Sequence, residues 1–205
     1  MTTKRIITAL TAIAISGVLL AGCTGTAGPT PTATTGSPTP TPTASSITGE
    51  APADEAEAID KAQATIDLLI VTQTEISAAG GTDASAYEAV ATGRALQEFQ
   101  EDALRISEGP ILNEDGVNVE GQSTVEGSLV FEPKTAYGQE WESVANGLVI
   151  VPGCLDGSNR KITTADGKPA MQNPNPRNEV EFHVIYNAET KTWLVNDRIS
   201  LGTTC

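Results

Sequence analysis

The chain changes its hydrophobic period at residues 109–110, a Gly-Pro dipeptide. Before this point, apolar residues recur every three or four positions, which is the spacing of amphipathic helices. After it, apolar and polar residues alternate, and Gly, Asn and Asp recur as turn residues, a pattern typical of antiparallel strands. This order predicts the α+β class, with two N-terminal helices packed on a curved antiparallel sheet.

Two helices are expected before the dipeptide. The first begins at Asp54, where acidic side chains complement the positive end of the helix dipole, and it ends at the glycine pair 80–81. The second is capped by Asp83 or Ser85. Because only a few residues separate the two helices, we expect an antiparallel helical hairpin. Their apolar stripes consist of Ile59, Ala62, Ile66, Leu69, Ile70 and Ile76 in the first, and Tyr87, Val90, Ala91, Ala95, Phe99, Ala103 and Ile106 in the second.

Five strands are expected after the dipeptide. Turns at residues 113–116 and 188–191 punctuate them. Residues 158–177 are expected to form a long irregular excursion between two strands. The strands cover residues 117–119, 123–132, 143–151, 180–187 and 193–199.

The first fifty residues have a different composition from the rest. Two basic residues precede the apolar run 6–20, which is short for a membrane span and suits the core of a secretory signal. Residues 24–48 are uncharged and rich in Thr and Pro, so they cannot bury enough apolar surface to fold; the closely spaced hydroxyls are candidate O-glycosylation sites. The chain is therefore divided into a leader (1–22), a disordered linker (23–50) and a folded domain (51–205).

The motif Leu20-Ala21-Gly22-Cys23 resembles the lipobox of bacterial lipoproteins. In that family the thiol of the residue matching Cys23 takes a diacylglycerol, the peptide before it is removed, and the new N-terminus is acylated. The resemblance implies an extracytoplasmic protein that acyl chains anchor to the outer face of the cell membrane. The alternatives are an ordinary signal peptide, in which Cys23 is incidental, and an uncleaved anchor.

The charge balance excludes several partners. The formal net charge is −14, from 26 acidic and 12 basic residues, and the basic residues form no cluster. Such a chain is not expected to bind nucleic acid or to lie flat on anionic lipid. Because the sequence has neither metal-ligand spacing nor a phosphate-binding glycine loop, no metal and no other cofactor is expected.

Two cysteines remain once Cys23 is assigned to lipid. In an extracytoplasmic compartment, Cys154 and Cys205 are expected to form a disulfide, which would hold the C-terminus in place. The alternative is a pair of buried free thiols.

The order of elements, the segment Val-Pro-Gly-Cys-Leu-Asp at 151–156 and the closing segment Trp-Leu-Val-Asn-Asp at 193–197 resemble small secreted lipoproteins with an NTF2-like domain. The resemblance covers residues 54–205. It implies a cone in which the sheet wraps around the helices and leaves a pocket at its open end. It does not imply catalysis, because this cone serves both enzymes and binding proteins.

Candidate catalytic residues are Asp197, Tyr87 and His183. Alternation places Asp197 on the apolar face of the last strand, where desolvation would raise its pKa if that face lines the cone. The alternative is a strand-end aspartate that is paired with Arg198, Arg177 or solvent. Alternation places His183 on the outer face of its strand beside Glu181, as a structural histidine rather than a catalytic one. The predicted inner face of that strand consists of Val180, Phe182, Val184 and Tyr186. Tyr87, like Tyr137 and Tyr186, could supply a phenol to a pocket or belong to the core.

We expect a non-enzymatic surface lipoprotein that binds a small apolar ligand or an envelope protein at the mouth of its cone. One alternative is an isomerase-like or hydratase-like enzyme that uses Asp197 with a pocket tyrosine. Another is a structural envelope protein that forms a homodimer through the open face of the sheet.

Overall fold

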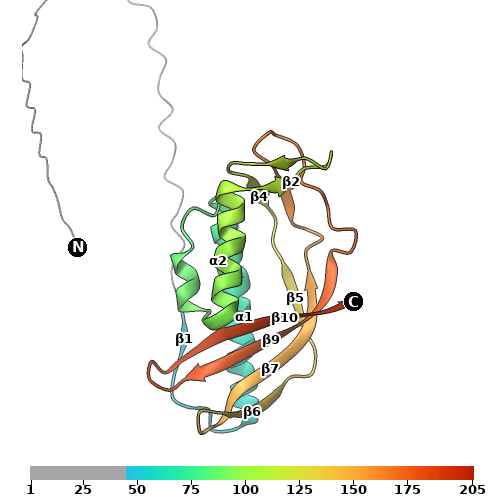
Figure 1. Ribbon diagram of the computed structural model, residues 1–205. Helices are drawn as coiled ribbons and strands as arrows, with labels where there is room; N and C mark the ends of the chain where they lie inside the picture. Colours follow the sequence, from blue (N-terminus) through green and yellow to red (C-terminus); the bar gives the residue numbers. More distant parts are fainter. Residues whose placement is uncertain (1–44) are drawn as a thin grey trace, which may run out of the picture. The chain divides into compact units, whose positions relative to one another are not determined.

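The structure is a computed structural model that describes residues 45–205. Two long helices pack against one face of a strongly curled antiparallel sheet (Figure 1), which confirms the predicted α+β class. The predicted leader, the predicted lipidation site Cys23 and most of the predicted linker lie outside the described residues.

The main sheet has the strand order β1-β10-β9-β7-β5, and β6 also pairs with β7. All of its pairings are antiparallel. The helical elements are α1 (Glu55–Ala78), the 3-10 helix η1 (Ser85–Ala89) and α2 (Gly93–Glu108). The strands are β1 (Ile47–Thr48), β2 (Ile111–Leu112), β3 (Asn118–Val119), β4 (Thr124–Glu126), β5 (Val130–Pro133), β6 (Tyr137–Trp141), β7 (Val144–Asp156), β8 (Lys161–Thr163), β9 (Arg177–Asn187) and β10 (Thr192–Thr204).

α1 has both of its predicted ends. The Asp54 carboxylate accepts a hydrogen bond from the backbone N–H of Glu57 (2.9 Å), and the Glu57 carboxylate accepts one from the N–H of Ala53 (3.0 Å). This reciprocal capping satisfies donors that the first helical turn leaves free. Gly80 and Gly81 then adopt φ values of 83° and 72°, which end the helix.

The second predicted helix is wrong over its first third. The carbonyl oxygen of Val90 accepts a hydrogen bond from the N–H of Val195 in β10 (2.9 Å), and the N–H of Thr92 donates to the carbonyl oxygen of Val195 (2.9 Å). This segment therefore extends along the edge of the sheet. The helix is interrupted after η1 and begins again at Gly93.

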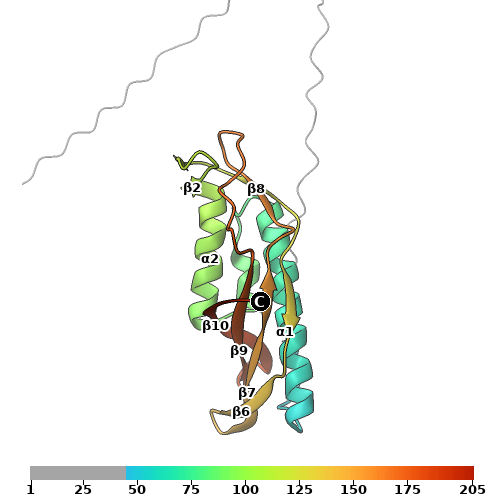
Figure 2. The ribbon, with the colours of Figure 1, turned by 90° about the vertical axis from the view of Figure 1, so that its right-hand side faces the viewer.

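The predicted antiparallel helical hairpin is also wrong, because α1 and α2 run in the same direction (Figures 1 and 2). The C-terminal ends of both helices meet: a Cβ atom at Gly81 would lie only 2.2 Å from the carbonyl oxygen of Ala103 in α2. Residues 82–92 carry the chain back along the helices before α2 starts.

The predicted strand 123–132 is two strands in different sheets. Gly127 separates them with φ 78°, and a Cβ atom there would lie 2.0 Å from the carbonyl oxygen of Asn159. β5 joins the main sheet, whereas β4 pairs with β8. The excursion 158–177 thus contains a strand that its composition did not indicate.

The folded part starts before the predicted boundary at residue 51. β1 pairs with β10, opposite Trp193 and Thr192. The Tyr186 hydroxyl donates a hydrogen bond to the carbonyl oxygen of Gly49 (3.1 Å). The end of the predicted disordered linker is therefore an edge strand of the sheet.

The core lies between the helices and the inner face of the sheet. The predicted inner face of β9 is confirmed, since all four of its members are buried. The largest fully buried side chains are Trp193, Tyr87, Phe99 and Phe182. All residues of the main core cluster lie between Ala58 and Val195, so the described part contains its own core.

Candidate functional site

A β-bulge in β10 decides which side chains face the helices. Val195 pairs with Val184, but the next residue in register, Asp197, pairs with His183. One extra residue in β10 reverses its alternation from this point. Arg198 consequently shares the inner face, whereas Asp197 shares the outer face with His183. The predicted placement of Asp197 on the inner apolar face is wrong for this reason.

Asp197 and His183 both have partners outside the cavity described below. Asp197 accepts a hydrogen bond from Nε of Arg94 at the start of α2 (2.6 Å), so it is a paired aspartate as in the predicted alternative, but its partner is neither Arg198 nor Arg177. His183 lies on the outer face as expected, with its Nε2 atom 2.7 Å from a carboxylate oxygen of Glu181. Neither residue lines the cavity described below.

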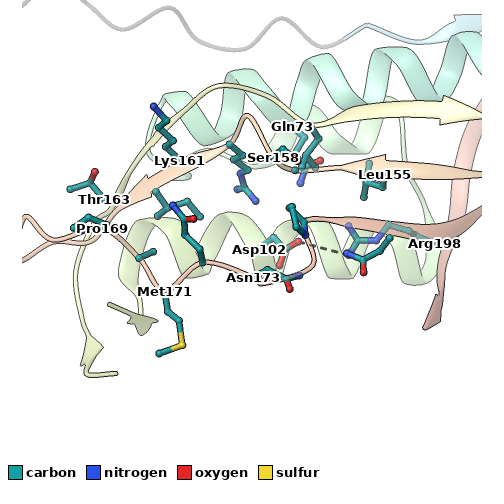
Figure 3. Close-up of a pocket in the computed structure, with 18 residues that line it drawn as sticks. Gln73, Asp102, Leu155, Ser158, Lys161, Thr163, Pro169, Met171, Asn173 and Arg198 are labelled. Carbon is teal, nitrogen blue, oxygen red and sulfur yellow. Dashed lines mark ion pairs between the residues drawn. The ribbon is translucent and has the colours of Figure 1, made fainter. Parts of the chain in front are cut away.

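A cavity of about 640 Å³ opens between the C-terminal halves of the two long helices and the end of the sheet (Figure 3). In Figure 3, Gln73 of α1 and Asp102 of α2 lie on opposite sides of the cavity. The remaining lining comes mainly from β8, from the loop after it and from the ends of β7 and β9. Its apolar members include Leu129, Leu155, Ile162, Pro169, Met171 and Pro176, and its other charged members are Arg160, Lys161 and Arg198.

Arg198 is held on one side of the cavity. Its guanidinium lies over the ring of Phe99, 5.0 Å from the centroid. Its Nη2 atom is 3.5 Å from a carboxylate oxygen of Glu98 and 3.9 Å from one of Asp102. Stacking on an aromatic face together with two carboxylates fixes the plane of the guanidinium.

Arg160 is half-buried and has weaker contacts than Arg198. Its Nη2 atom donates a long hydrogen bond to the Ser77 hydroxyl (3.4 Å). Among the described residues, no carboxylate oxygen lies within 4.0 Å of its guanidinium. Burial lowers the pKa of Arg160, an effect that the more distant Asp102 carboxylate opposes. An arginine nevertheless stays charged throughout the physiological range.

Tyr87 is the sequence candidate that lies beside these charged groups. It is 1% exposed and stacks on Phe99 with ring centroids 5.4 Å apart. Burial raises the pKa of its phenol, and the Asp102 carboxylate acts in the same direction, against the nearby Arg160. Tyr87 therefore stays protonated and is not a base at neutral pH.

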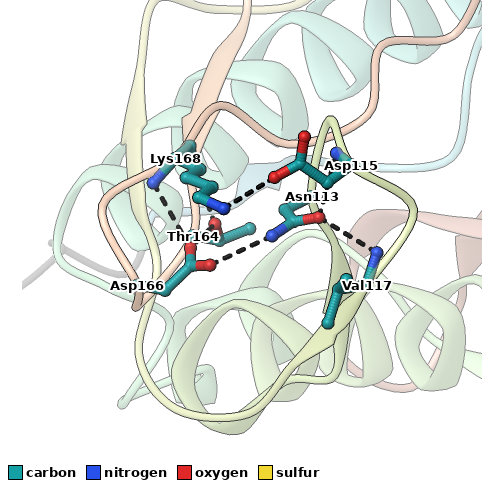
Figure 4. Close-up of polar contacts among 6 residues, drawn as sticks. All are labelled: Asn113, Asp115, Val117, Thr164, Asp166 and Lys168. Atoms are coloured by element: carbon teal, nitrogen blue, oxygen red, sulfur yellow. Dashed lines mark hydrogen bonds and ion pairs between the residues drawn. The ribbon is translucent and has the colours of Figure 1, made fainter.

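A polar network ties the loops that close this end of the molecule (Figure 4). The buried Asn113 side chain accepts hydrogen bonds from the N–H groups of Asp115 (3.1 Å) and Val117 (3.0 Å), as the predicted turn requires. Its Nδ2 atom donates to the Asp166 carboxylate (3.0 Å), which also accepts from the Thr164 hydroxyl (2.6 Å). The β2–β3 turn is thereby fastened to the turn after β8.

The same network lowers the pKa of Asp166. The hydrogen bond from Thr164 lowers the pKa of Asp166, and the amide of Asn113 adds to this effect. A salt bridge between Lys168 and Asp115 (2.6 Å) joins the same two turns at the surface. The fastening is therefore strongest while Asp166 is ionised.

The two predicted disulfide partners lie together. Cys154 is buried at the outer face of β7, and Cys205 is the last residue of the chain. Their Cα atoms are 6.0 Å apart and their sulfur atoms are at bonding distance. This position agrees with the expectation that the pair holds the C-terminus.

Sequence reasoning missed the residues that give the cavity its polarity. Gln73 is 4% exposed within α1, and its Oε1 atom has no hydrogen-bond partner. A glutamine on the buried stripe of an amphipathic helix was a usable signal, because such a residue needs a partner. Arg160 lay inside the excursion predicted to be irregular, and nothing in the local pattern marked it.

The described residues contain no group of three or more His, Cys, Asp or Glu side chains placed to hold a metal ion. None of their helices is both long enough and apolar enough to cross a membrane. Comparisons with family models, with curated proteins and with solved structures found no match to this chain.

Proposed function

We propose that this chain is a lipid-anchored, extracytoplasmic lipoprotein whose NTF2-like domain binds a small ligand in the cavity at the open end of its cone. The cavity of about 640 Å³ carries the ligand-binding part of the proposal, because its volume falls in the range of small-molecule sites. The lipobox-like motif that ends at Cys23 supports the anchoring part.

A binding role suits the side chains around the cavity better than catalysis does. The enzyme alternative depended on Asp197, which lies on the outer face of the sheet and is paired with Arg94 at the start of α2. Tyr87 is held protonated, and His183 is bonded to Glu181 on the other side of the sheet. General acid–base chemistry needs a group within hydrogen-bond reach of the substrate. None of these three sequence candidates supplies such a base to the cavity.

The binding role is tested with the chain from Thr24 onward, which lacks the predicted leader and Cys23 but contains the complete described part. Octanol and octanoate are titrated into it by isothermal calorimetry. We expect saturable one-to-one binding of at least one of them. The variant Ala170→Trp, which places an indole at the cavity wall, should abolish that binding with little change in thermal midpoint. Absence of binding of both compounds to the unmodified chain would contradict the proposal.

The anchor is tested separately by growing cells that express the full chain with an alkyne analogue of palmitate. The unmodified chain should take up the label and stay in the membrane fraction, and Cys23→Ser should take up none. Label on Cys23→Ser would refute lipidation at this residue.

A homodimer is a second candidate role. The outer face of the sheet carries the exposed side chains of Val130 and Tyr137, and the described helices pack on the opposite face. Light scattering should then give twice the monomer mass at micromolar concentration, and Tyr137→Glu should return it to the monomer. A monomeric unmodified chain would exclude this role.

A further inference from the structure

Arg160 brings a charge to the cavity wall that no described carboxylate neutralises at contact distance. Its side chain is half-buried, and the hydrogen bond to Ser77 is long, at 3.4 Å. A charge that is withdrawn from water and left unpaired is costly, so such groups are normally matched by an opposite charge. The protein has an excess of acidic residues, yet none of the described ones forms a salt bridge with the Arg160 guanidinium.

Arg198 is an arginine of the same cavity whose guanidinium does have carboxylate partners. Glu98 and Asp102 approach its guanidinium, and Phe99 covers one face of it. These contacts leave Arg160 as the arginine of this cavity whose donors are available to a ligand. A planar guanidinium can pair with both oxygens of a carboxylate.

Gln73 gives an independent indication of a polar ligand. It is nine-tenths buried, it points from α1 into the cavity (Figure 3), and its Oε1 atom has no partner. A buried polar atom without a partner is rare in folded proteins. Because half a rotation exchanges the oxygen and nitrogen of an amide, Gln73 can present an N–H donor at this position.

Part of the cavity wall is apolar and suits the hydrocarbon part of a ligand. Leu129, Leu155 and Ile162 line the same cavity. The formal charge of −14 repels polyanions from the molecule as a whole, so a ligand with a single negative charge and an apolar chain fits best.

Resting on the proposed ligand-binding role, we propose that the cavity takes an amphipathic monocarboxylate, with its carboxylate paired to Arg160, its second hydrogen bond coming from Gln73, and its chain packed on Leu155 and Ile162.

The test compares octanoate with the neutral octanol by isothermal calorimetry, using the chain from Thr24 onward. The unmodified chain should bind octanoate about 10- to 100-fold more tightly than octanol, as expected for hydrogen bonds to a charged group. Arg160→Gln should remove this preference. Arg160→Lys should keep part of the preference. Lys191→Gln, which removes an exposed charge outside the cavity lining, is the matched control and should change octanoate binding less than about twofold.

Thermal midpoints of all variants establish that they fold. Equal affinity of the unmodified chain for octanoate and octanol would overturn the carboxylate assignment and leave the ligand-binding role standing. A preference for octanoate that survives in Arg160→Gln would overturn the role of Arg160. If neither compound binds, the inference fails together with the proposed function. If Arg160→Gln does not fold, the comparison of octanoate with octanol is made on Arg160→Lys and Gln73→Leu, each of which must reduce the preference.

Discussion

Removal of the Cys154–Cys205 disulfide should destabilise the domain by an amount that depends on the length of the loop that the disulfide closes. The two residues are separated by 51 positions. Opening a loop of this size restores conformational entropy to the unfolded chain, and the loop-closure relation gives about 4 kcal/mol at 25 °C. The change tested is Cys205→Ser, because Cys205 is exposed and its replacement leaves the buried environment of Cys154 in place.

Fraying of the folded protein makes the expected loss in the free energy of unfolding smaller than this value. Between Ser200 and Thr204 the pairing of β10 with β9 is interrupted, and residues 200–205 are exposed. Without the cross-link this tail can fray, which returns some entropy to the folded protein. We therefore expect a loss of about 2–4 kcal/mol in the free energy of unfolding.

Urea titration followed by tryptophan fluorescence measures the loss, since Trp193 is buried in the core. With a slope of about 2 kcal/mol per M, the midpoint should fall by about 1–2 M. Reduction of the unmodified chain should give the same midpoint as Cys205→Ser, whose own midpoint should not respond to reductant. A loss below about 0.5 kcal/mol, or two free thiols in the intact mass of the unmodified chain, would refute the reasoning.

Three further predictions concern the fold. Gly127→Ala should cost about 2 kcal/mol or more, because φ is 78° and the new Cβ atom would meet the carbonyl oxygen of Asn159; urea titration measures it, and an unchanged midpoint would contradict the role of this glycine. Leu69→Ala, at a fully buried position, should cost about 2–5 kcal/mol, whereas Val71→Ala on the exposed side of the same helix should cost less than about 0.5 kcal/mol; equal losses would contradict the assigned helix face. The lowered pKa of Asp166 means that its ionised form stabilises the fold above its unfolded pKa of about 3.9, and this contribution disappears as the pH falls through the lower folded value. The free energy of unfolding of Asp166→Asn should thus be lower than that of the unmodified chain at pH 7 and equal to it near pH 2. A difference that persists in acid would refute the electrostatic cause.

The parts of the fold that were predictable are those that local patterns control. α1 could be bounded from the sequence because its caps consist of neighbouring residues, Asp54 at one end and Gly80 at the other. The inner face of β9 could be read from alternation because the strand is regular along its length. The turn at Asn113 could be located because a side chain within the turn makes its hydrogen bonds.

The wrong predictions depend on contacts between distant segments. The N–H and C=O groups of Val195 pair with residues 90–92 and interrupt what reads as a single helix. Gly127 must be a glycine because of Asn159, thirty-two positions later, and local composition does not show that contact. Tertiary pairing of this kind routinely overrides local propensity.

The candidate site was the least predictable part, because one β-bulge in β10 exchanges the faces of the sheet to which two neighbouring side chains point. Without the extra residue in β10, Asp197 would face the helices and Arg198 the outside. The bulge places a cation on the inner face instead. Gln73 could be found from the sequence, since a glutamine on the buried stripe of a helix needs a hydrogen-bond partner. Arg160 could not, because it reaches the cavity only through the packing of the segment around β8 against α1.

The most direct test of the central claim is a crystal structure of the chain from Thr24 onward, grown with octanoate. We expect the octanoate carboxylate to lie within hydrogen-bond distance of the Arg160 guanidinium and of the Gln73 amide, with its chain against Leu155 and Ile162. An empty cavity at a saturating concentration of octanoate, or a carboxylate bound only at an exposed lysine, would contradict it.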